Sequence, residues 1–341
     1  MVYNEAQNSF KGATMTTKEE VFNILKESGA TYISGEEIAK RLYVTRAAVW
    51  KSIKALKQEG HIIEAVTNRG YRLKVDTRAL DARIINNYLK DQKDIPEIFV
   101  YTETGSTNDE ALNYAKEHPG REAVFVAGKQ TKGRGRRGRD FYSPEDTGLY
   151  LSFLIYPKVS FSEAALYTCM AAVALCNSIK RVTGIDTGIK WVNDIYLNDR
   201  KISGILTEGI TSVEDMSLSH VVIGVGINVF NPYGGFPDSI KDIAGYLFNE
   251  RTDTDVREHL CADYIAELLD YVRGNRSNFV EEYRDLSILI GKYVRVETFK
   301  EGVKNKYARV TGIDDSCGLI VRYEDGHEET LSSGEVSVKK Y

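Results

Sequence analysis

Arginine and glycine alternate in the run Gly133-Arg-Gly-Arg-Arg-Gly-Arg139, the part of the sequence best suited to binding an anion. Glycine lets a backbone approach a ligand closely, and each guanidinium offers a fork of donors that matches phosphate or carboxylate oxygens. The run therefore suits a polyanion whose charge grows during a reaction. Its spacing satisfies G-x-G-x-x-G, but Asp140-Phe-Tyr-Ser-Pro144 and a strand follow it instead of the helix that a dinucleotide-binding loop opens, and it lacks the G-K-[ST] of a P-loop.

Two shorter runs place polar residues beside predicted strands. Ser106, Thr107 and Asn108 follow a strand and open a helix, where hydroxyls, a carboxamide and free helix N–H groups can bind a small polar ring. Lys190-Trp-Val-Asn-Asp194 puts a cation and a carboxylate around the middle of a predicted strand. Taken alone, the first run is more often a helix cap, and a single lysine is more often a surface charge.

Two more runs come next along the chain. Lys201-Ile-Ser-Gly-Ile205 begins a strand after a turn at Asn198-Asp199, and Gly224-Val-Gly-Ile-Asn228 is a strand of small residues that ends in an amide. Each is a weak signal in isolation. Together with the arginine run they favour a binding site over a solvated basic loop.

The elements that must position these residues form a mixed α/β domain with hairpins, because strands and helices alternate from residue 99. Strands are predicted at FVYTET, AVFVAGKQ, LYLSFLIY, IKWVNDIYL, KISGILTEG and HVVIGVGINVF, and helices at 108–117 and 164–179. A charged helical connector at 76–95 precedes this domain, and a helical stretch at 255–287 follows it. Short strands rich in Tyr, Val and Gly between 289 and 340 predict a small β-barrel.

The first segment predicts a winged helix-turn-helix. Three helices begin near residues 17, 34 and 45, with Ser34 and Glu37 as a capping box, Thr45 as the next cap and Gly60 as the last stop. A hairpin of strands 61–66 and 71–75 turns at 67–70, with glycine where positive φ is needed. In the third helix Val49, Ile53 and Leu56 face inward, which turns the following side chains outward: Arg46, Ala47, Trp50, Lys51 and Lys54.

Charge and composition agree with a DNA-binding head on an enzyme. Residues 16–75 hold 11 Lys and Arg against 7 Asp and Glu, a net of +4, which leaves −8 for the rest of a chain whose net charge is −4. The chain of 341 residues is 42% hydrophobic, as expected of a globular protein with two or three domains.

Several classes of protein are disfavoured. The polar N-terminus argues against secretion, and the apolar stretch 164–179 is too short and too polar to span a bilayer, so we expect a cytoplasmic protein without a membrane partner. The four cysteines are scattered and are expected to be reduced and structural, without a zinc site or a disulfide framework. We recognise no Ser/His/Asp signature among the five histidines.

In this order, the motifs closely resemble the biotin protein ligase family, in its bifunctional form as the biotin operon repressor. The resemblance runs from about residue 17 to the C-terminus, through ISGEEIAKRLYVTRAAVWKSIKAL, GSTN, GRGRRGR, KWVND, KISGIL and GVGIN. It implies an α+β chain: a flexible extension (1–15), a winged helix-turn-helix (16–80), a central mixed α/β ligase domain of the class II synthetase-like type (81–287), and an SH3-like β-barrel (288–341).

The resemblance also implies roles for individual residues. Arg136, Lys190, Asp194 and Lys201 are expected to be catalytic. The residues expected to bind biotin and ATP are Ser106, Thr107, Asn108, Gln130, Arg134, Gly135, Arg136, Phe141, Lys190, Asn193, Asp194, Lys201, Gly204 and Asn228. Those expected to bind DNA are Gly35, Arg46, Ala47, Trp50, Lys51, Lys54 and Arg69. No metal is held by the protein alone; Mg²⁺ arrives with ATP, near Asp194.

The implied activity is biotin–[biotin carboxyl-carrier protein] ligation: biotin and ATP give biotinyl-5'-AMP and pyrophosphate, and the biotin passes to a lysine of a carrier protein. The carrier belongs to acetyl-CoA carboxylase or another biotin-dependent carboxylase, and the other partners are operator DNA and a second copy of the chain. Biotin is both substrate and effector. The family usually has proline where Val192 stands, and either Phe141 or Tyr142 is expected to stack on adenine. The Gly- and Pro-rich loop 230–237 is a candidate lid.

Other functions remain open. A lipoate ligase shares the catalytic fold, but GRGRRGR and KWVND favour biotin. A non-enzymatic ligand-sensing repressor would share the head, although Lys190, Asp194 and Lys201 argue against it. A ligase with a vestigial head is a third alternative. An RNA-binding role for the arginine run is the weakest, because no aromatic platform motif accompanies it.

Overall fold

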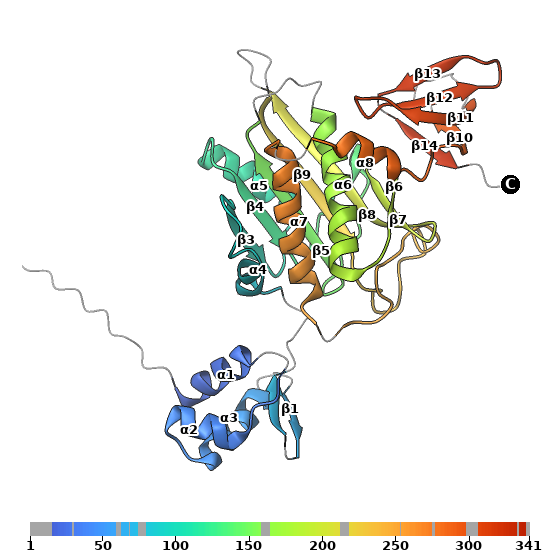
Figure 1. Cartoon of the computed structure of the whole chain (residues 1–341). Helices are drawn as coiled ribbons and strands as arrows, with labels where there is room; N and C mark the ends of the chain where they lie inside the picture. The colour runs from blue at the N-terminus through green and yellow to red at the C-terminus, as the bar shows by residue number, and fades with distance from the viewer. Residues whose placement is uncertain are drawn as a thin grey trace, which may run out of the picture. The chain divides into compact units, whose positions relative to one another are not determined.

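The computed structural model describes residues 16–28, 31–58, 63–67, 69–73, 80–157, 164–211, 218–252, 254–274, 277–297, 306–332 and 334–338. The predicted extension at 1–15, the helix stop at Gly60, and parts of the predicted wing strands and connector lie outside these residues. The chain forms two compact units, Met1–Thr77 and Arg78–Tyr341. We call the first unit the head and the second the body, and describe each by itself (Figure 1).

The head is the expected winged helix-turn-helix. Its elements are α1 (Thr17–Glu27), α2 (Gly35–Leu42), α3 (Arg46–Gln58), β1 (Ile63–Val66) and β2 (Gly70–Leu73), with β1 and β2 antiparallel. The predicted inner face of α3 is confirmed, because Val49, Ile53 and Leu56 are all buried in one apolar cluster with side chains of α1 and α2.

Local signals set the ends of these helices. The hydroxyl of Ser34 accepts from the backbone N–H of Glu37 at 3.0 Å, and that of Thr45 accepts from Ala48 at 3.2 Å, so both caps are confirmed. The second half of the expected capping box differs: the Glu37 carboxylate accepts from Arg41 at 2.6 Å, one turn along the solvent face.

The wing turns at Gly70, whose φ is +104°. Glycine is required there for a second reason, because a Cβ atom would lie 2.2 Å from the carbonyl oxygen of Ile33. Ile33, which precedes α2, exchanges backbone hydrogen bonds with Tyr71 at 2.9 and 2.8 Å, so a single residue pairs with the edge of β2 that β1 does not occupy.

The body is built on a seven-stranded sheet in the order β3-β4-β5-β9-β8-β7-β6. Its strands are β3 (Glu97–Tyr101), β4 (Ala123–Ala127), β5 (Gly148–Ile155), β6 (Gly188–Lys190), β7 (Asp194–Leu197), β8 (Arg200–Thr211) and β9 (Leu218–Asn228). Only the β3–β4 pair is parallel among these neighbours. This is the mixed α/β domain with hairpins that the sequence predicts.

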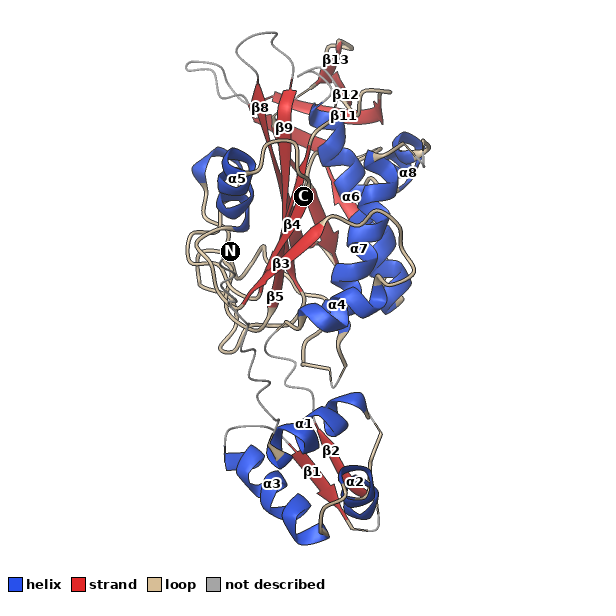
Figure 2. Ribbon diagram, turned by 90° about the vertical axis from the view of Figure 1, so that its left-hand side faces the viewer, coloured by secondary structure: helices blue, strands red, loops and turns tan. Residues whose placement is uncertain are grey.

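Helices cover both faces of this sheet (Figure 2). On one face lie α4 (Ala82–Tyr88), α6 (Ala164–Thr183), α7 (Val256–Val272) and α8 (Phe279–Asp285), and on the other lies α5 (Thr107–Glu117). The middle of α6 is almost entirely apolar and fully buried against the sheet and α7. None of the helices in the described parts of the chain is long and apolar enough to cross a membrane.

Three predicted elements differ from the structure. The connector predicted as helical over 76–95 is helical only over α4 among its described residues, 80–95. The run 189–197, expected to be one strand, is a hairpin: β6 and β7 pair with Lys190 opposite Asp194, and residues 191–193 form the turn, with a cis peptide bond between Trp191 and Val192. Apolar residues lie in the turn as well as in both strands, so the apolar pattern alone does not reveal it. The helical stretch 255–287 is two helices, α7 and α8, separated near Gly274, whose φ is +74°.

The C-terminal part of the body is a five-stranded antiparallel sheet in the order β13-β12-β11-β10-β14, the small all-β domain that the sequence predicts. Its strands are β10 (Tyr293–Glu297), β11 (Lys306–Ile313), β12 (Leu319–Tyr323), β13 (Glu328–Leu331) and β14 (Glu335–Val338). The buried indole of Trp191 donates to the carbonyl of Cys317 at 2.9 Å, and Arg284 donates to that of Ile313 at 2.8 Å. These bonds join the C-terminal sheet to the hairpin turn and to α8.

Candidate active site

A cavity of about 700 Å³ opens in the body where α5, the arginine run and strands β7, β8 and β9 meet. Every residue predicted to bind biotin or ATP lies on its wall: Ser106, Thr107, Asn108, Gln130, Arg134, Gly135, Arg136, Phe141, Lys190, Asn193, Asp194, Lys201, Gly204 and Asn228. These positions span more than a hundred residues of sequence. Their convergence is a property of the sheet order, because β9 lies between β5 and β8.

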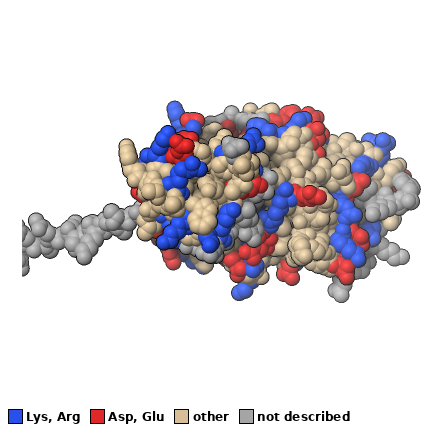
Figure 3. All heavy atoms as spheres, turned by 90° about the horizontal axis from the view of Figure 1, so that it is seen from below, with Lys and Arg blue, Asp and Glu red and all other residues tan. Residues whose placement is uncertain are grey.

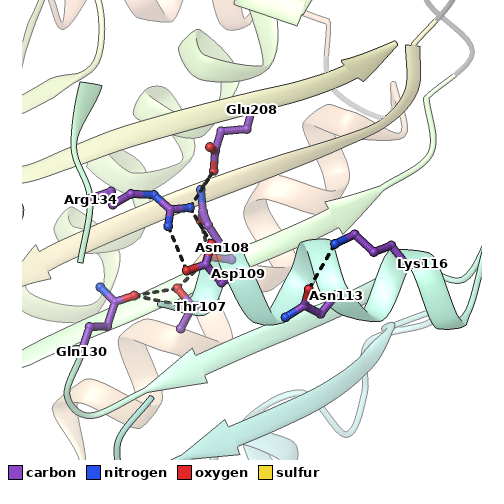
Figure 4. Close-up of polar contacts among 9 residues, drawn as sticks. Thr107, Asn108, Asp109, Asn113, Lys116, Gln130, Arg134 and Glu208 are labelled. Carbon is purple, nitrogen blue, oxygen red and sulfur yellow. Dashed lines mark hydrogen bonds and ion pairs between the residues drawn. The ribbon is translucent and has the colours of Figure 1, made fainter. Parts of the chain in front are cut away.

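A neutral polar end of the cavity is formed by three residues at the start of α5: Ser106, Thr107 and Asn108. Ser106 is the N-cap residue and is 3% exposed. The backbone N–H of Thr107 donates to Oε1 of Gln130 at 2.9 Å, and Nε2 of Gln130 donates to the hydroxyl of Ser143 at 3.2 Å. A helix N-terminus and a fixed carboxamide thus lie side by side (Figure 4).

A charged network borders this end. Nη atoms of Arg134 lie 2.7 and 2.8 Å from the carboxylate oxygens of Asp109, and Nη2 lies 3.8 Å from Oε2 of Glu208. The hydrogen bond to Asp109 raises the pKa of the Arg134 guanidinium. Oε2 of Glu208 also accepts from Nδ2 of Asn108 at 2.5 Å, so one carboxylate joins the start of α5 to the arginine run (Figure 4).

Another part of the cavity wall carries two lysines beside the carboxylate of Asp194. Nζ of Lys201 lies 2.6 Å from Oδ1 of Asp194, and both side chains are partly exposed. Pairing of β6 with β7 puts Lys190 opposite Asp194. Nζ of Lys190 lies 3.5 Å from the hydroxyl of Tyr196. Burial, followed by the nearby Asp194 carboxylate, raises the pKa of Tyr196 to about 12, so this phenol stays protonated at neutral pH.

Arg136 reaches across from the short 3₁₀ turn η1 (Arg136–Gly138) to the hairpin turn. Its Nη1 donates to Oδ1 of Asn193 at 3.1 Å, and Nδ2 of Asn193 donates to the carbonyl of Ile205 at 2.7 Å. The side chain therefore joins the arginine run to the hairpin turn on the cavity wall.

Glycines make the cavity possible. A Cβ atom on Gly226 would lie 2.3 Å from the ring of Phe141, and one on Gly224 would lie 2.1 Å from Oδ1 of Asn108. The ring of Phe141 packs edge-on against Tyr150, with 6.5 Å between centroids. Tyr142 is 39% exposed and its ring centroid lies 6.3 Å from that of Phe236. Phe141 thus lies on the glycine strands and Tyr142 faces the predicted lid; which of them stacks on adenine stays a prediction.

The predicted lid, 230–237, contributes Phe236 and Pro237 to the cavity wall. The segment that follows it is tied to the start of β8: the N–H of Lys201 donates to the carbonyl of Ile243 at 2.8 Å, and Gly245 donates to that of Lys201 at 2.7 Å. The carboxamide of Asn228 donates to the carbonyl of Gly245 at 2.9 Å. Asn228 therefore anchors this segment as well as lining the cavity.

Some residues at the site escape sequence reasoning. Gly334, Val336 and Ser337 of the C-terminal sheet line the cavity, and Nη2 of Arg136 lies 3.5 Å from the carbonyl of Gly334. No local signal marks them, because they reach the site through tertiary contacts alone. Glu208 and Ser152, which fix Asn108, also carry no signal: each is one polar residue inside a predicted strand.

The residues predicted to bind DNA divide into two groups. Arg46, Ala47, Trp50, Lys51 and Lys54 are all exposed on α3, with Nζ of Lys54 5.5 Å from the Trp50 ring. Gly35 and Arg69 have contacts within the head. A Cβ on Gly35 would lie 3.1 Å from the ring of Tyr71. The guanidinium of Arg69 lies 5.3 Å from the centroid of the Tyr32 ring. In Figure 3 basic and acidic side chains are interspersed over the face shown.

Three families match successive parts of the chain. Residues 17–72 match an HTH domain family, residues 99–228 the Biotin/lipoate A/B protein ligase family, and residues 289–339 the Biotin protein ligase C terminal domain family. The order is that of the head, the seven-stranded sheet and the C-terminal sheet. The chain thus has the architecture of a ligase of the biotin/lipoate class with a helix-turn-helix module.

Relatives of similar length narrow this class. The bifunctional ligase/repressor BirA of Bacillus subtilis is 32% identical over 93% of this chain and 98% of its own, and that of Escherichia coli is 27% identical over 90% and 92%. The biotin protein ligase from Aquifex aeolicus, solved in complex with biotin and ATP, is 25% identical, with a TM-score of 0.57 over 72% of this chain and 99% of its own. The chain therefore belongs to the biotin protein ligase family, in its bifunctional ligase/repressor form.

Proposed function

We propose that the chain activates biotin with ATP, transfers it to a lysine of a biotin carboxyl carrier protein, and represses biotin genes through its head. The observation that carries the ligase function is the cavity, whose wall combines neutral donors and acceptors at the start of α5 with the cations Arg136, Lys190 and Lys201. Biotin offers groups that suit both kinds of residue, because it has a neutral cyclic urea and a carboxylate.

In this arrangement the ring binds beside Ser106, Thr107 and Gln130. The carboxylate lies toward Arg136 and Lys201, where charge-assisted hydrogen bonds are strongest. A carboxylate oxygen attacks the α-phosphorus of ATP, the bond to the β-phosphate bridging oxygen breaks, and pyrophosphate leaves. The cations stabilise the negative charge that builds on the phosphates.

The second step uses the carrier protein as nucleophile. Its lysine amine attacks the acyl carbon of the mixed anhydride, the bond to the phosphate oxygen breaks, AMP leaves and the nitrogen loses a proton. The chain supplies no covalent nucleophile in this scheme, and the segment 230–237 keeps water from the anhydride.

Mg²⁺ is proposed to enter with the nucleotide and to neutralise phosphate charge. Among the described residues on the cavity wall the carboxylates are Asp140 and Asp194, and no group of three or more potential metal-binding side chains occurs in the described parts of the chain. Asp194 fits an ion held mainly by phosphate oxygens, because such an ion needs only one or two protein carboxylates.

The ligase proposal is tested by incubating the chain with a carrier domain, biotin and Mg²⁺, with and without ATP. We expect pyrophosphate release that depends on biotin and a covalent biotin on the carrier only when ATP is present. Lipoate in place of biotin tests the sister activity of the same family. Transfer of lipoate but not of biotin would overturn the assignment of biotin as the substrate. If no pyrophosphate is released in response to biotin, the chain would be a ligand-sensing repressor without ligase activity.

The repressor function rests on the exposed face of α3. The second helix of a helix-turn-helix enters the major groove with its N-terminal residues on base edges, so Arg46 at the start of α3 is proposed to read a base. We propose that the chain acts in the cytoplasm as a homodimer on two half-sites, and that biotinyl-adenylate strengthens dimerisation.

Gel-shift titrations with and without biotin plus ATP test this proposal. Arg46→Ala should abolish specific binding, whereas Lys57→Ala, an exposed lysine in the last turn of the same helix, is the matched control. Equal operator affinity with and without biotin plus ATP would contradict the sensing role. If specific binding is absent in both conditions, the head is a vestigial module.

A further inference from the structure

A chain of hydrogen bonds runs from a carboxylate to the neutral end of the cavity. Oε2 of Glu208, on β8, accepts from Nδ2 of Asn108 at 2.5 Å. The hydroxyl oxygen of Ser152, on β5, lies 2.5 Å from Oδ1 of Asn108 and 2.7 Å from Oγ1 of Thr107. Ser152 is fully buried, and Thr107 and Asn108 line the cavity. We call this chain of four residues the relay.

The direction of every proton in the relay follows from its carboxylate end. An ionised carboxylate only accepts, so the NH₂ of Asn108 points to Glu208 and its oxygen points to Ser152. The carboxamide is held in place by packing as well, because Gly224 leaves room for it where a Cβ would lie 2.1 Å from Oδ1. The single proton of the Ser152 hydroxyl must then donate to Asn108.

The next proton is decided by distance. Two hydroxyl oxygens 2.7 Å apart need a proton between them, and that of Ser152 is already used, so the Thr107 hydroxyl donates to Ser152. The competing acceptor for Thr107 is Oε1 of Gln130 at 3.2 Å, longer than the usual 2.7–2.8 Å of an O–H···O bond and already bonded to the backbone N–H of Thr107. Thr107 therefore has no proton left for a ligand.

We propose that Glu208, acting through Asn108 and Ser152, makes the Thr107 hydroxyl an obligate acceptor, so that the cavity selects a ring with an N–H donor at this point. The inference rests on the proposed function, in which that ring is the cyclic urea of biotin. Glu208 is a positioning residue that determines specificity without touching the ligand. A site built around an unpaired acceptor rejects an analogue that lacks the donor, because the acceptor is then buried without a partner.

A second role of Glu208 must be separated from the first. Its carboxylate also lies 3.8 Å from Nη2 of Arg134, which is held mainly by Asp109 at 2.7 Å. Asp109→Asn weakens the tie on Arg134 and leaves the relay intact. It is therefore the matched control for Glu208→Gln, which keeps the size of the side chain but lets its carboxamide donate as well as accept.

The test is a ratio of affinities, measured by calorimetry on the full chain. The ligands are biotin and the two cyclic carbamate analogues, each with one ring N–H replaced by oxygen. We expect the parent to discriminate strongly against at least one analogue, Glu208→Gln to reduce that ratio by about tenfold or more, and Asp109→Asn to leave it within about twofold. General damage to the site weakens both ligands and cancels in the ratio.

Ser152→Ala gives a second variant that breaks the relay at its buried link and frees the Thr107 proton. It should reduce the ratio in the same direction. An unchanged ratio in folded Glu208→Gln and Ser152→Ala, or an equal change in Asp109→Asn, overturns the relay. A parent chain that does not bind biotin overturns the proposed function instead, so the two failures are distinguishable.

Discussion

Replacing Arg136 by alanine should distinguish the role of this side chain in binding the adenylate from its role in the stability of the fold. In the structure its guanidinium donates to the neutral Asn193 side chain at 3.1 Å and lies 3.5 Å from the carbonyl of Gly334. Bonds of this kind at a partly exposed site are worth about 0.5–1.5 kcal/mol each, and the second is at the limit of hydrogen-bond length. We therefore expect Arg136→Ala to lower the free energy of unfolding by about 1 kcal/mol and to leave the chain folded.

The effect on the adenylate should be larger. A guanidinium bonded to a carboxylate or phosphate oxygen contributes about 1.5–3 kcal/mol, which corresponds to roughly 10- to 150-fold in a dissociation rate. The variant should thus form biotinyl-adenylate but release it faster, into water or onto unrelated lysines.

The assay is a filter-binding chase of labelled biotinyl-adenylate from the full chain. Arg137→Ala is the matched control, because it removes the same side chain from the next residue, which lies outside the described cavity wall. It should release the adenylate at the parent rate. Equal retention by Arg136→Ala and the parent would refute the role of Arg136, and equal loss in both variants would assign the effect to net charge.

Three further outcomes are expected. Trp191→Phe removes the indole N–H that donates to the buried carbonyl of Cys317. Urea unfolding should then show that the free energy of unfolding falls by about 1–3 kcal/mol, and unchanged stability would contradict this. Gly226→Ala should abolish biotin-dependent pyrophosphate release in a folded chain, because the added Cβ collides with the ring of Phe141, whereas Gly105→Ala, with nothing within 4 Å, should not. Tyr43→Gly should stabilise the head by about 1 kcal/mol, because Tyr43 is 97% exposed at a φ of +54°; slower amide exchange in α2 and α3 would support this, and faster exchange would contradict it.

Much of the fold follows from local signals in the sequence. Ser34 and Thr45 begin α2 and α3, because a hydroxyl before a helix can satisfy a free N–H whatever surrounds it. Gly70 turns the wing because positive φ is a property of one residue. Apolar spacing placed Val49 and Ile53 inside the head without any knowledge of their partners.

The types of residue at the candidate site were also determined by the sequence, because cations, hydroxyls and glycines keep their chemistry in any fold. Their arrangement was not. Lys190 and Asp194 face each other only because the run between them turns back as a hairpin, and this depends on the register of β6 with β7. The pairing of Lys201 with Asp194 likewise requires β7 to lie beside β8.

Only the tertiary structure brings in the residues that carry no motif. Glu208 acts on Asn108 across 100 positions of sequence, and Gly334 reaches Arg136 from the far end of the chain. Such contacts form between residues that are distant in sequence and are brought together by the order of the strands. The apolar and polar pattern of one segment therefore does not predict them. The sequence by itself therefore determined the elements, the family and the chemical groups, while the sheet topology decided which groups meet and which protons they share.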